Sequence, residues 1–270
     1  MYRLLALDLD GTVIGKDRRV TDPVRAAVTA AQEAGVHISL ATGRVFRSAL
    51  PFAQQLGLRA PLICCQGAVI RHPLTGDVLH CTPLPGLLAA EAIGLLQDAG
   101  VCVLADIDER LGIIDDGAQF AAFVRRWGAP DPKELFVAAD LAEVARLRPP
   151  TKIMFFADPP ALDRELARLT MHFGATLSVV RSDVTLGELT APGLSKGLAL
   201  AILAGHLGVA REQVMAIGDE ENDVPMLQWA GLGLAMGNAP ASVQRHAKAT
   251  IPSFEQDGVA WAIREYLLRE

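Results

Sequence analysis

The chain has 270 residues, of which 51% are hydrophobic and 21% are charged, with a formal net charge of −6. This composition excludes an intrinsically disordered chain, which would be too polar to bury a core. The acidic balance argues against a broad nucleic-acid-binding surface and against a basic patch for anionic lipid. It does not exclude a small anionic substrate, because local charge in a cleft can oppose the net charge. The length allows one large domain or two smaller ones.

Three features bear on where the protein works. No segment reaches the ~18 consecutive apolar residues of a membrane span. The apolar run from Leu4 to Leu7 stops at Asp8 and is too short for the core of a signal peptide. The cysteines lack CxxC spacing and are typical of small buried residues in a reducing compartment: Cys64, Cys65, Cys81 and Cys102. We therefore expect a cytoplasmic protein with neither a membrane nor a nucleic-acid partner.

The first 70 residues alternate short apolar runs with helical patterns. Two helices are expected, one starting at Thr21-Asp22-Pro23 and ending at Gly35, and one from about Arg44 to Leu56. The apolar runs before, between and after them predict strands at Leu4–Leu9, Val36–Leu40 and Pro61–Cys65. Strands that alternate with helices predict a parallel sheet with crossover helices.

The middle of the chain has a different order of elements. Val69-Ile70 and Val78-Leu79 flank a turn and predict a hairpin. From Pro83 to about Thr185 we expect a mixed α/β segment. One expected helix ends at Gly100, and three others span Gln119–Trp127, Leu141–Leu147 and Ala161–His172. A loop rich in Pro and Asp follows Trp127. Its strands lie near Val101–Ala105, Leu111–Ile114, Lys152–Phe156 and on both sides of Ser182-Asp183. We interpret this segment as an inserted domain.

The last third repeats the pattern of the first. The expected order is a helix at Leu194–His206, a strand at Val214–Gly218, a helix at Asn222–Trp229, a strand at Leu232–Met236 and a closing helix at Gly258–Glu270. We interpret it as the other half of one doubly wound α/β fold with a parallel sheet. Residues 1–82 and 186–270 would then form a discontinuous core, and residues 83–185 a separate α/β domain.

Two strands of the expected sheet end in acid clusters. Asp8 and Asp10 lie two residues apart on an extended chain, so their side chains point the same way. Asp219 and Asp223 follow the strand at Val214–Gly218. Taken singly, the first pair could be a capped turn and the second an acidic helix N-terminus. Together, at the ends of strands in one sheet, they supply the hard oxygen ligands that Mg²⁺ prefers.

Two other segments suit a phosphate group. Thr42-Gly43 follows the second strand and precedes a helix, whose free N–H groups favour anions. Lys196 begins a later helix and could neutralise phosphoryl charge. Each signal is weak alone, because a capping threonine and a solvated lysine are commoner.

The order of the four segments DxDGT, ATGR, SKG and GDxxND, from Asp8 to Asp223, resembles the haloacid dehalogenase-like phosphatase superfamily. More narrowly it resembles the Cof-type phosphatases, which carry a large α/β cap between the second and third motifs. The tail Gly233–Ala239 is similar to that subfamily as well. The resemblance implies a Rossmann-like core formed by residues 1–82 and 186–270, with a cap formed by residues 83–185.

By motif, the resemblance implies a role for each matching residue. Asp8 would be the nucleophile and Asp10 the general acid and base. The phosphate would be held by Thr42, Gly43, Lys196 and Asn222, and Mg²⁺ by Asp8, Asp10, Asp219 and Asp223, with Asp10 offering its main-chain carbonyl. The subfamily commonly has Asn-Gly where this chain has Gln66-Gly67, so contact between Gln66 and a substrate stays open.

The expected function is a Mg²⁺-dependent phosphomonoester hydrolase that acts on a small phosphorylated metabolite through an aspartyl-phosphate. The nearest alternative is a phosphomutase or phosphotransferase, and a second is a noncatalytic protein that binds such metabolites. A nicotinamide-dependent oxidoreductase is disfavoured because no proper glycine fingerprint occurs. The sequence names neither the substrate nor the oligomeric state. Five charged residues of the middle segment could either face the site or be ordinary surface charge: Asp106, Asp108, Arg110, Arg181 and Asp183.

Overall fold

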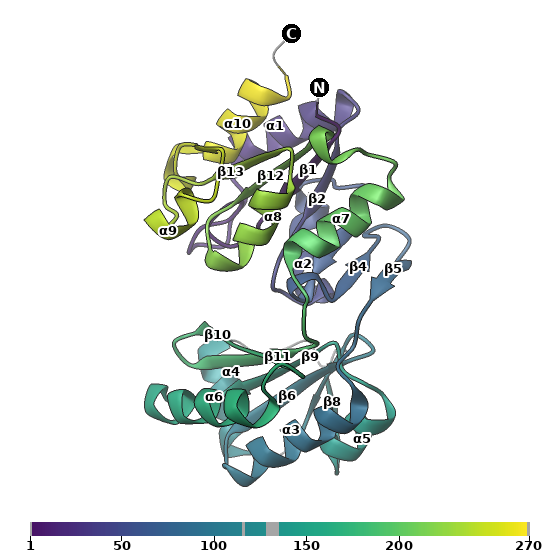
Figure 1. The fold of residues 1–270 in the computed structure, drawn as a ribbon, viewed down its shortest axis with the longest axis vertical. Coiled ribbons are helices and arrows are strands. Elements are labelled where there is room, and N and C mark those ends of the chain that lie inside the picture. The colour runs from purple at the N-terminus through teal and green to yellow at the C-terminus, as the bar shows by residue number, and fades with distance from the viewer. Residues whose placement is uncertain (1, 115–116, 128–134, 269–270) are drawn as a thin grey trace. The chain divides into compact units, whose positions relative to one another are not determined.

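The structure is a computed structural model, and it describes residues 2–114, 117–127 and 135–268. The chain divides into two compact units. The first unit comprises Met1–Cys81 together with Leu194–Glu270, and the second comprises Thr82–Gly193. The first unit has a five-stranded and a three-stranded sheet, and the second has one six-stranded sheet (Figure 1). Each unit also has its own hydrophobic core.

The first unit is built on a five-stranded parallel sheet. Its strand order is β14-β13-β12-β1-β2, and every neighbouring pair is parallel. The strands are β1 (Leu4–Leu7), β2 (His37–Leu40), β12 (Val214–Gly218), β13 (Leu232–Ala235) and β14 (Ala249–Thr250). The central β1 pairs with β2 from the first third of the chain and with β12 from the last third. The predicted doubly wound α/β fold is confirmed.

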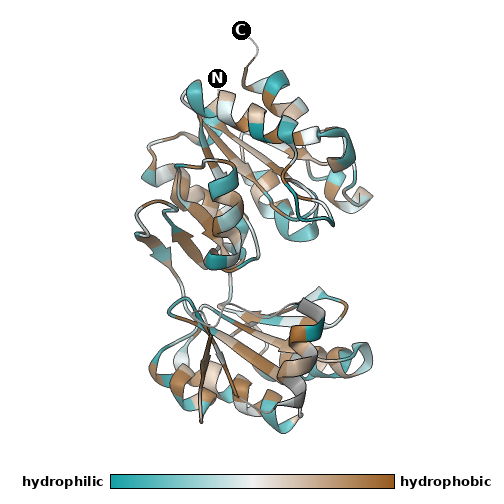
Figure 2. Cartoon of the chain, turned by 180° about the vertical axis from the view of Figure 1, so that it is seen from behind, coloured by the Kyte–Doolittle hydropathy of each residue, from teal (hydrophilic) through white to brown (hydrophobic). Residues whose placement is uncertain are grey.

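Helices cover both faces of this sheet because its strands are apolar on both sides. Leu5 and Leu7 of β1 belong to one core cluster and Leu4 and Ala6 to another, as the two-residue repeat of a strand requires. The strands accordingly appear brown in Figure 2. The first cluster includes α1 (Asp22–Glu33), α2 (Phe46–Gln55) and α10 (Gly258–Tyr266). The second includes α7 (Lys196–His206), α8 (Val224–Trp229) and α9 (Ala241–Gln244).

The expected third parallel strand belongs instead to a small antiparallel sheet. The segment β3 (Leu62–Cys64) pairs with β4 (Val69–Arg71), which pairs with β5 (Val78–Cys81). A single parallel bridge between Ala41 and Ile63 joins β3 to the chain beyond β2. Because Ala41 directly follows the last residue of β2, the bridge lies beyond the end of that strand, and β3 is not one of the strands of the parallel sheet. The predicted hairpin at 69–79 is confirmed as β4 and β5.

The second unit is a six-stranded mixed sheet with the order β10-β11-β9-β6-β7-β8. Its strands are β6 (Cys102–Ile107), β7 (Arg110–Ile113), β8 (Leu135–Val137), β9 (Lys152–Phe156), β10 (Ser178–Asp183) and β11 (Leu186–Thr190). Alternate residues of β6 and β9 pack into one core with α3 (Gly86–Asp98), α5 (Leu141–Leu147) and α6 (Pro159–Phe173). A smaller cluster on the other residues of β6 includes Phe120 and Phe123 of α4 (Ala118–Trp127).

Several element boundaries differ from those expected. Leu186–Thr190 pairs with β9, so the second unit continues to Gly193 instead of ending at residue 185. The strands β8 and β14 and the helix α9 were not predicted, because four residues or fewer give little periodic signal. The predicted loop rich in Pro and Asp falls largely on residues 128–134, outside the described residues. Within the described ranges, no helix has the length and apolar character needed to cross a membrane.

Candidate active site

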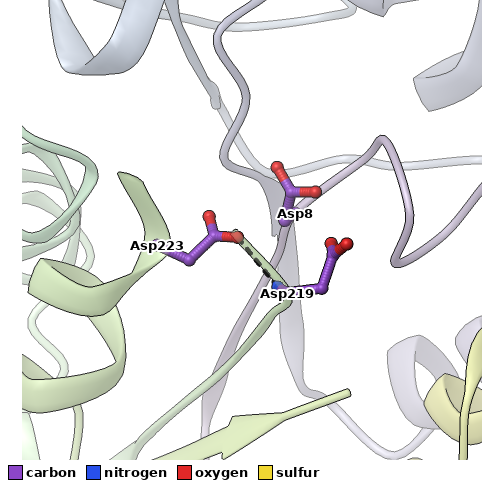
Figure 3. Close-up of side chains that lie close together, drawn as sticks. All are labelled: Asp8, Asp219 and Asp223. Carbon is purple, nitrogen blue, oxygen red and sulfur yellow. Dashed lines mark hydrogen bonds between the residues drawn. The ribbon is translucent and has the colours of Figure 1, made fainter. Parts of the chain in front are cut away.

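Three buried carboxylates meet at the carboxyl end of the parallel sheet (Figure 3). Asp8 directly follows β1, and Asp219 directly follows β12. Asp223 comes from the short 3₁₀ helix η4 (Glu221–Asp223), just before α8. One oxygen from each carboxylate lies within 4.8 Å of the others. The register explains the meeting, because Leu7 pairs with Ile217 and both strands therefore end at the same edge.

Lys196 is the cation that faces two of these carboxylates. Its Nζ donates to Asp8 Oδ1 and to Asp223 Oδ1, both at 2.6 Å, and its side chain is only 1% exposed. Burial lowers the pKa of Lys196, but the charges of Asp223 and Asp8 outweigh that effect and leave the pKa above its usual value. The ammonium group therefore stays protonated.

Asp223 is fixed through both of its oxygens. While Oδ1 accepts from Lys196, Oδ2 accepts from the main-chain N–H groups of Asp219 and Glu220, each at 2.9 Å. A Cβ at Gly218 would lie 2.5 Å from the Asp223 carboxyl carbon, so only glycine fits there. With both oxygens engaged, Asp223 holds Lys196 and the start of the 219–223 turn in place.

Asp219 is oriented by two hydrogen bonds that come from different parts of the chain. Its Oδ1 accepts from Thr12 Oγ1 at 2.7 Å, and its Oδ2 accepts from Asn238 Nδ2 at 3.2 Å. Burial raises the pKa of Asp219 to about 6, against the lowering effect of the Thr12 hydrogen bond. A Cβ at Gly11 would come within 2.2 Å of Asp219 Oδ2, so the DxDGT turn needs its glycine to approach this carboxylate.

The negative charge of Asp8 is unfavourable in its buried position. Burial, followed by the charge of Asp223, raises the pKa of Asp8 well above its usual range, although Lys196 opposes this. Among the described residues, the only cation paired with these three buried carboxylates is Lys196, which contacts Asp8 and Asp223, so the ionised group would keep net negative charge in a place shielded from water. A divalent cation with hard oxygen ligands would compensate it. The donor set of Asp8, Asp219 and Asp223 therefore fits Mg²⁺.

Asp10 lies apart from these three carboxylates. Arg44 holds its carboxylate with two bonds, Nε to Oδ2 at 2.7 Å and Nη2 to Oδ1 at 2.6 Å, and the Asp10 side chain is 55% exposed. The metal contact predicted for Asp10 goes through its main-chain carbonyl and stays a prediction. A solvent-accessible carboxylate two residues beyond Asp8 is suitably placed to exchange protons with a ligand and with water.

The phosphate-binding residues expected from the sequence come from three segments: Thr42 and Gly43 after β2, Lys196 at the start of α7, and Asn222 in η4. Thr42 is 1% exposed, and its Oγ1 accepts from the Arg44 main-chain N–H at 3.1 Å. Asn222 donates from Nδ2 to Gln66 Oε1 at 3.1 Å. Gln66 in turn donates its main-chain N–H to the Thr42 carbonyl at 3.2 Å. Gln66 thus joins the segment after β2 to the turn after β12.

The model of the haloacid dehalogenase-like hydrolase family matches residues 5–263. The chain belongs to this family. The resemblance found in the four motifs is therefore confirmed, and so is the enzyme class, a hydrolase.

Relatives of this haloacid dehalogenase-like hydrolase cover nearly its whole length. The 5-amino-6-(5-phospho-D-ribitylamino)uracil phosphatase YitU of Bacillus subtilis is 28% identical over 97% of both chains. The pyridoxal phosphate phosphatase YbhA of Escherichia coli is 29% identical over 98% of this chain and 99% of its own. A crystal structure of a haloacid dehalogenase-like hydrolase from Bacteroides thetaiotaomicron superposes with a TM-score of 0.86 at 26% identity, covering 98% and 99% of the two chains. The predicted phosphatase class agrees with the names of these relatives.

The partners of three residues of the hydrolase site were not identified from the sequence alone. Thr12 and Asn238 orient Asp219, and Arg44 holds Asp10. Thr12 was within reach of sequence reasoning, since it directly follows the Asp8-Asp10 pair. The bond from Asn238 spans 19 residues and the bond from Arg44 spans 34, so only the fold reveals them.

The five charged residues left open in the middle segment have partners within the second unit. Asp108 pairs with Arg148, and Arg181 pairs with Asp163. Asp106 Oδ2 accepts from Thr151 Oγ1 at 2.6 Å. Arg110 lies over the Phe136 ring, and Asp183 Oδ1 accepts from the Thr185 main-chain N–H at 3.3 Å. These contacts assign none of the five to a substrate.

Proposed function

We propose that this hydrolase is a Mg²⁺-dependent phosphomonoesterase that works through a phosphorylated Asp8. The observation that carries the proposal is the buried group of Asp8, Lys196, Asp223 and Asp219. A carboxylate held beside a permanent cation and a divalent-ion site can approach a phosphate dianion without prohibitive repulsion. Mg²⁺, when bound, would screen the two anions and stabilise charge in the transition state.

In the first step an Asp8 carboxylate oxygen attacks phosphorus, and the bond from phosphorus to the ester oxygen breaks. Asp10 gives a proton to the departing alkoxide, which leaves as an alcohol. Lys196, Thr42, Gly43 and Asn222 bind the nonreacting phosphoryl oxygens. This step divides one difficult hydrolysis into two easier ones.

In the second step water attacks the phosphorus of the acyl phosphate on Asp8, and Asp10 takes a proton from that water. The bond between phosphorus and the Asp8 oxygen breaks, so inorganic phosphate leaves and the Asp8 carboxylate is restored. The exposure of Asp10 suits this double use, because the same carboxyl must meet first the leaving group and then water.

We propose a small phosphorylated metabolite as the substrate. The names of YitU and YbhA give substrates of this size, a phosphorylated ribitylaminouracil and pyridoxal phosphate. The residues to which we give catalytic roles all belong to the first unit, and we assign the role of a substrate-selecting cap to the second. A cytoplasmic location fits both the metabolite substrate and the cysteine spacing.

Release of inorganic phosphate from a panel of phosphorylated metabolites, with and without Mg²⁺, tests this function. We expect release that needs Mg²⁺ and disappears in Asp8→Asn. The control is Asp17→Asn, which makes the same change at an exposed residue and should match the wild type. Transfer of phosphate to a sugar hydroxyl without net release would instead indicate a phosphotransferase. Equal release by the wild type and Asp8→Asn would refute the proposal.

A further inference from the structure

Gln66 lies in a strained turn where the proposed phosphate-binding segments meet. The 3₁₀ turn η1 (Cys65–Gly67) follows β3, and its three residues all have positive φ, 52° at Cys65, 58° at Gln66 and 103° at Gly67. Two consecutive non-glycine residues in this region cost backbone energy. Such strain persists only where the surrounding structure fixes it, and it gathers at functional sites.

Three separate contacts hold this turn. The main-chain N–H of Cys65 donates to the Arg44 carbonyl at 2.9 Å, and that of Gln66 donates to the Thr42 carbonyl. On the other side, a Cβ at Gly67 would lie 2.6 Å from the Ser195 carbonyl oxygen, directly before Lys196. The turn is therefore fixed against both the Thr42 segment and the start of α7.

The side chain of Gln66 continues this bridge. Its Oε1 accepts from Asn222 Nδ2 at 3.1 Å. Its Nε2 lies over Gly43, so close that a Cβ on Gly43 would approach Nε2 to 2.4 Å. The amide thus contacts Asn222 and Gly43, which both bind phosphate oxygens in the proposed function. Among the described residues, none accepts a hydrogen bond from Nε2, which leaves its two N–H groups available to a ligand.

We propose that Gln66 is a phosphate-binding residue of this hydrolase, with its Nε2 donating to a phosphoryl oxygen while its Oε1 positions Asn222. The inference rests on the proposed function. The two ends of the amide take separate roles. The hydrogen bond from Asn222 fixes Oε1 on one side, and Nε2 therefore points toward the Thr42-Gly43 segment. A neutral amide can donate to a phosphate that already faces Lys196 without adding charge.

The test compares three variants in phosphate release and in binding of inorganic phosphate. Gln66→Glu keeps an acceptor for Asn222 but replaces the donor with a negative charge, so KM and the inhibition constant of inorganic phosphate should each rise about tenfold or more. Gln66→Gly removes the side chain and relieves the backbone, so the same two constants should rise about fivefold without a lower melting temperature. Gln55→Glu is the control, because it adds the same charge at an exposed position of α2 and should change neither constant.

Activity and stability together decide the outcome. If the wild type releases no phosphate from any ester, the proposed function fails. If the wild type is active and both Gln66 variants bind inorganic phosphate within twofold of it, the assignment of Gln66 is wrong. The assignment is also wrong if the losses simply follow lowered melting temperatures. Should Gln66→Glu fail to fold, Gln66→Gly alone decides, by weaker phosphate binding at unchanged or raised stability.

Discussion

At the scale of single residues, Asp10 has the clearest chemical signature. We expect Asp10→Asn to lower kcat by about 10²–10⁴-fold for alkyl phosphates, because an alkoxide leaving group needs a proton. The loss in the first step should be much smaller for p-nitrophenyl phosphate, whose phenolate leaves without one. Single-turnover rates on the two substrates measure this difference. Equal losses on both would show that Asp10 is not the general acid.

The stabilisation of the protein by Mg²⁺ should depend on pH, because Asp219 titrates. Its pKa is raised by burial from 3.8 to about 6, so between these pH values the folded metal-free protein binds more protons than the unfolded chain. Stability of the metal-free protein therefore falls as pH rises through this window, by about 1–3 kcal/mol. In the proposed site Mg²⁺ would bind the ionised carboxylate of Asp219, so its stabilising effect should grow over the same range.

Thermal unfolding with Mg²⁺ and with chelator checks this expectation. The rise in melting temperature caused by Mg²⁺ should be larger at about pH 7.5 than at about pH 5. Without metal, Asp219→Asn should be more stable than the wild type at the higher pH and should lose the response to Mg²⁺. An Mg²⁺ effect of the same size at both pH values would contradict the assignment of Asp219.

The individual residues also show how far sequence reasoning reached. Asp8, Asp219, Asp223 and Lys196 were all singled out, because each sits beside a strand or helix end whose position follows from local patterns. Their proximity needed only the assumption of one parallel sheet. The hydrogen bonds from Arg44 to Asp10 and from Asn238 to Asp219 could not be predicted. They depend on loop conformations, which local sequence patterns do not determine.

At the scale of elements, the start of α7 links helix stability to the site. Ser195 caps this helix, and its Oγ accepts from the Leu198 main-chain N–H at 3.1 Å. Ser195→Ala should cost about 1 kcal/mol of unfolding free energy. It should also lower kcat/KM, because the next residue is Lys196.

Thr21→Ala gives the comparison for this capping effect. Thr21 caps α1, where its Oγ1 accepts from the Val24 main-chain N–H. Denaturant unfolding should show at least as large a loss as for Ser195→Ala, since Thr21 also donates to Asp257. Its kcat/KM should stay near that of the wild type. If both variants lost activity in proportion to stability, the cap of α7 would have no particular role at the site.

The elements themselves were predicted unevenly. Leu141–Leu147, Lys152–Phe156 and Val214–Gly218 have the predicted bounds, because periodic apolar runs end there at clear turn residues. The second domain boundary was placed too early. Leu186–Thr190 looks like any buried strand, and only its pairing with β9 assigns it to the second unit. Pairing partners are a tertiary property that a single sequence does not display.

At the scale of the whole molecule, the second unit should fold on its own. Thr82–Gly193 is one continuous stretch, and its main core draws on β6, β9 and three helices of the same stretch. Residues 82–193 expressed alone should therefore unfold cooperatively with heat and show dispersed amide NMR signals. A fragment with collapsed signals and no cooperative transition would show that this core needs the rest of the chain.

The central claim for the whole molecule is that phosphate passes through Asp8. The most direct measurement is mass spectrometry of peptides from acid-quenched Asp10→Asn enzyme after mixing with p-nitrophenyl phosphate and Mg²⁺. This substrate loads the enzyme without a general acid, while the missing Asp10 slows hydrolysis of the acyl phosphate. We predict one phosphoryl group on the peptide that contains Asp8, and none when Asp8→Asn is added. A phosphoryl group on another residue, or p-nitrophenol release at an undiminished rate with Asp8→Asn, would contradict the account.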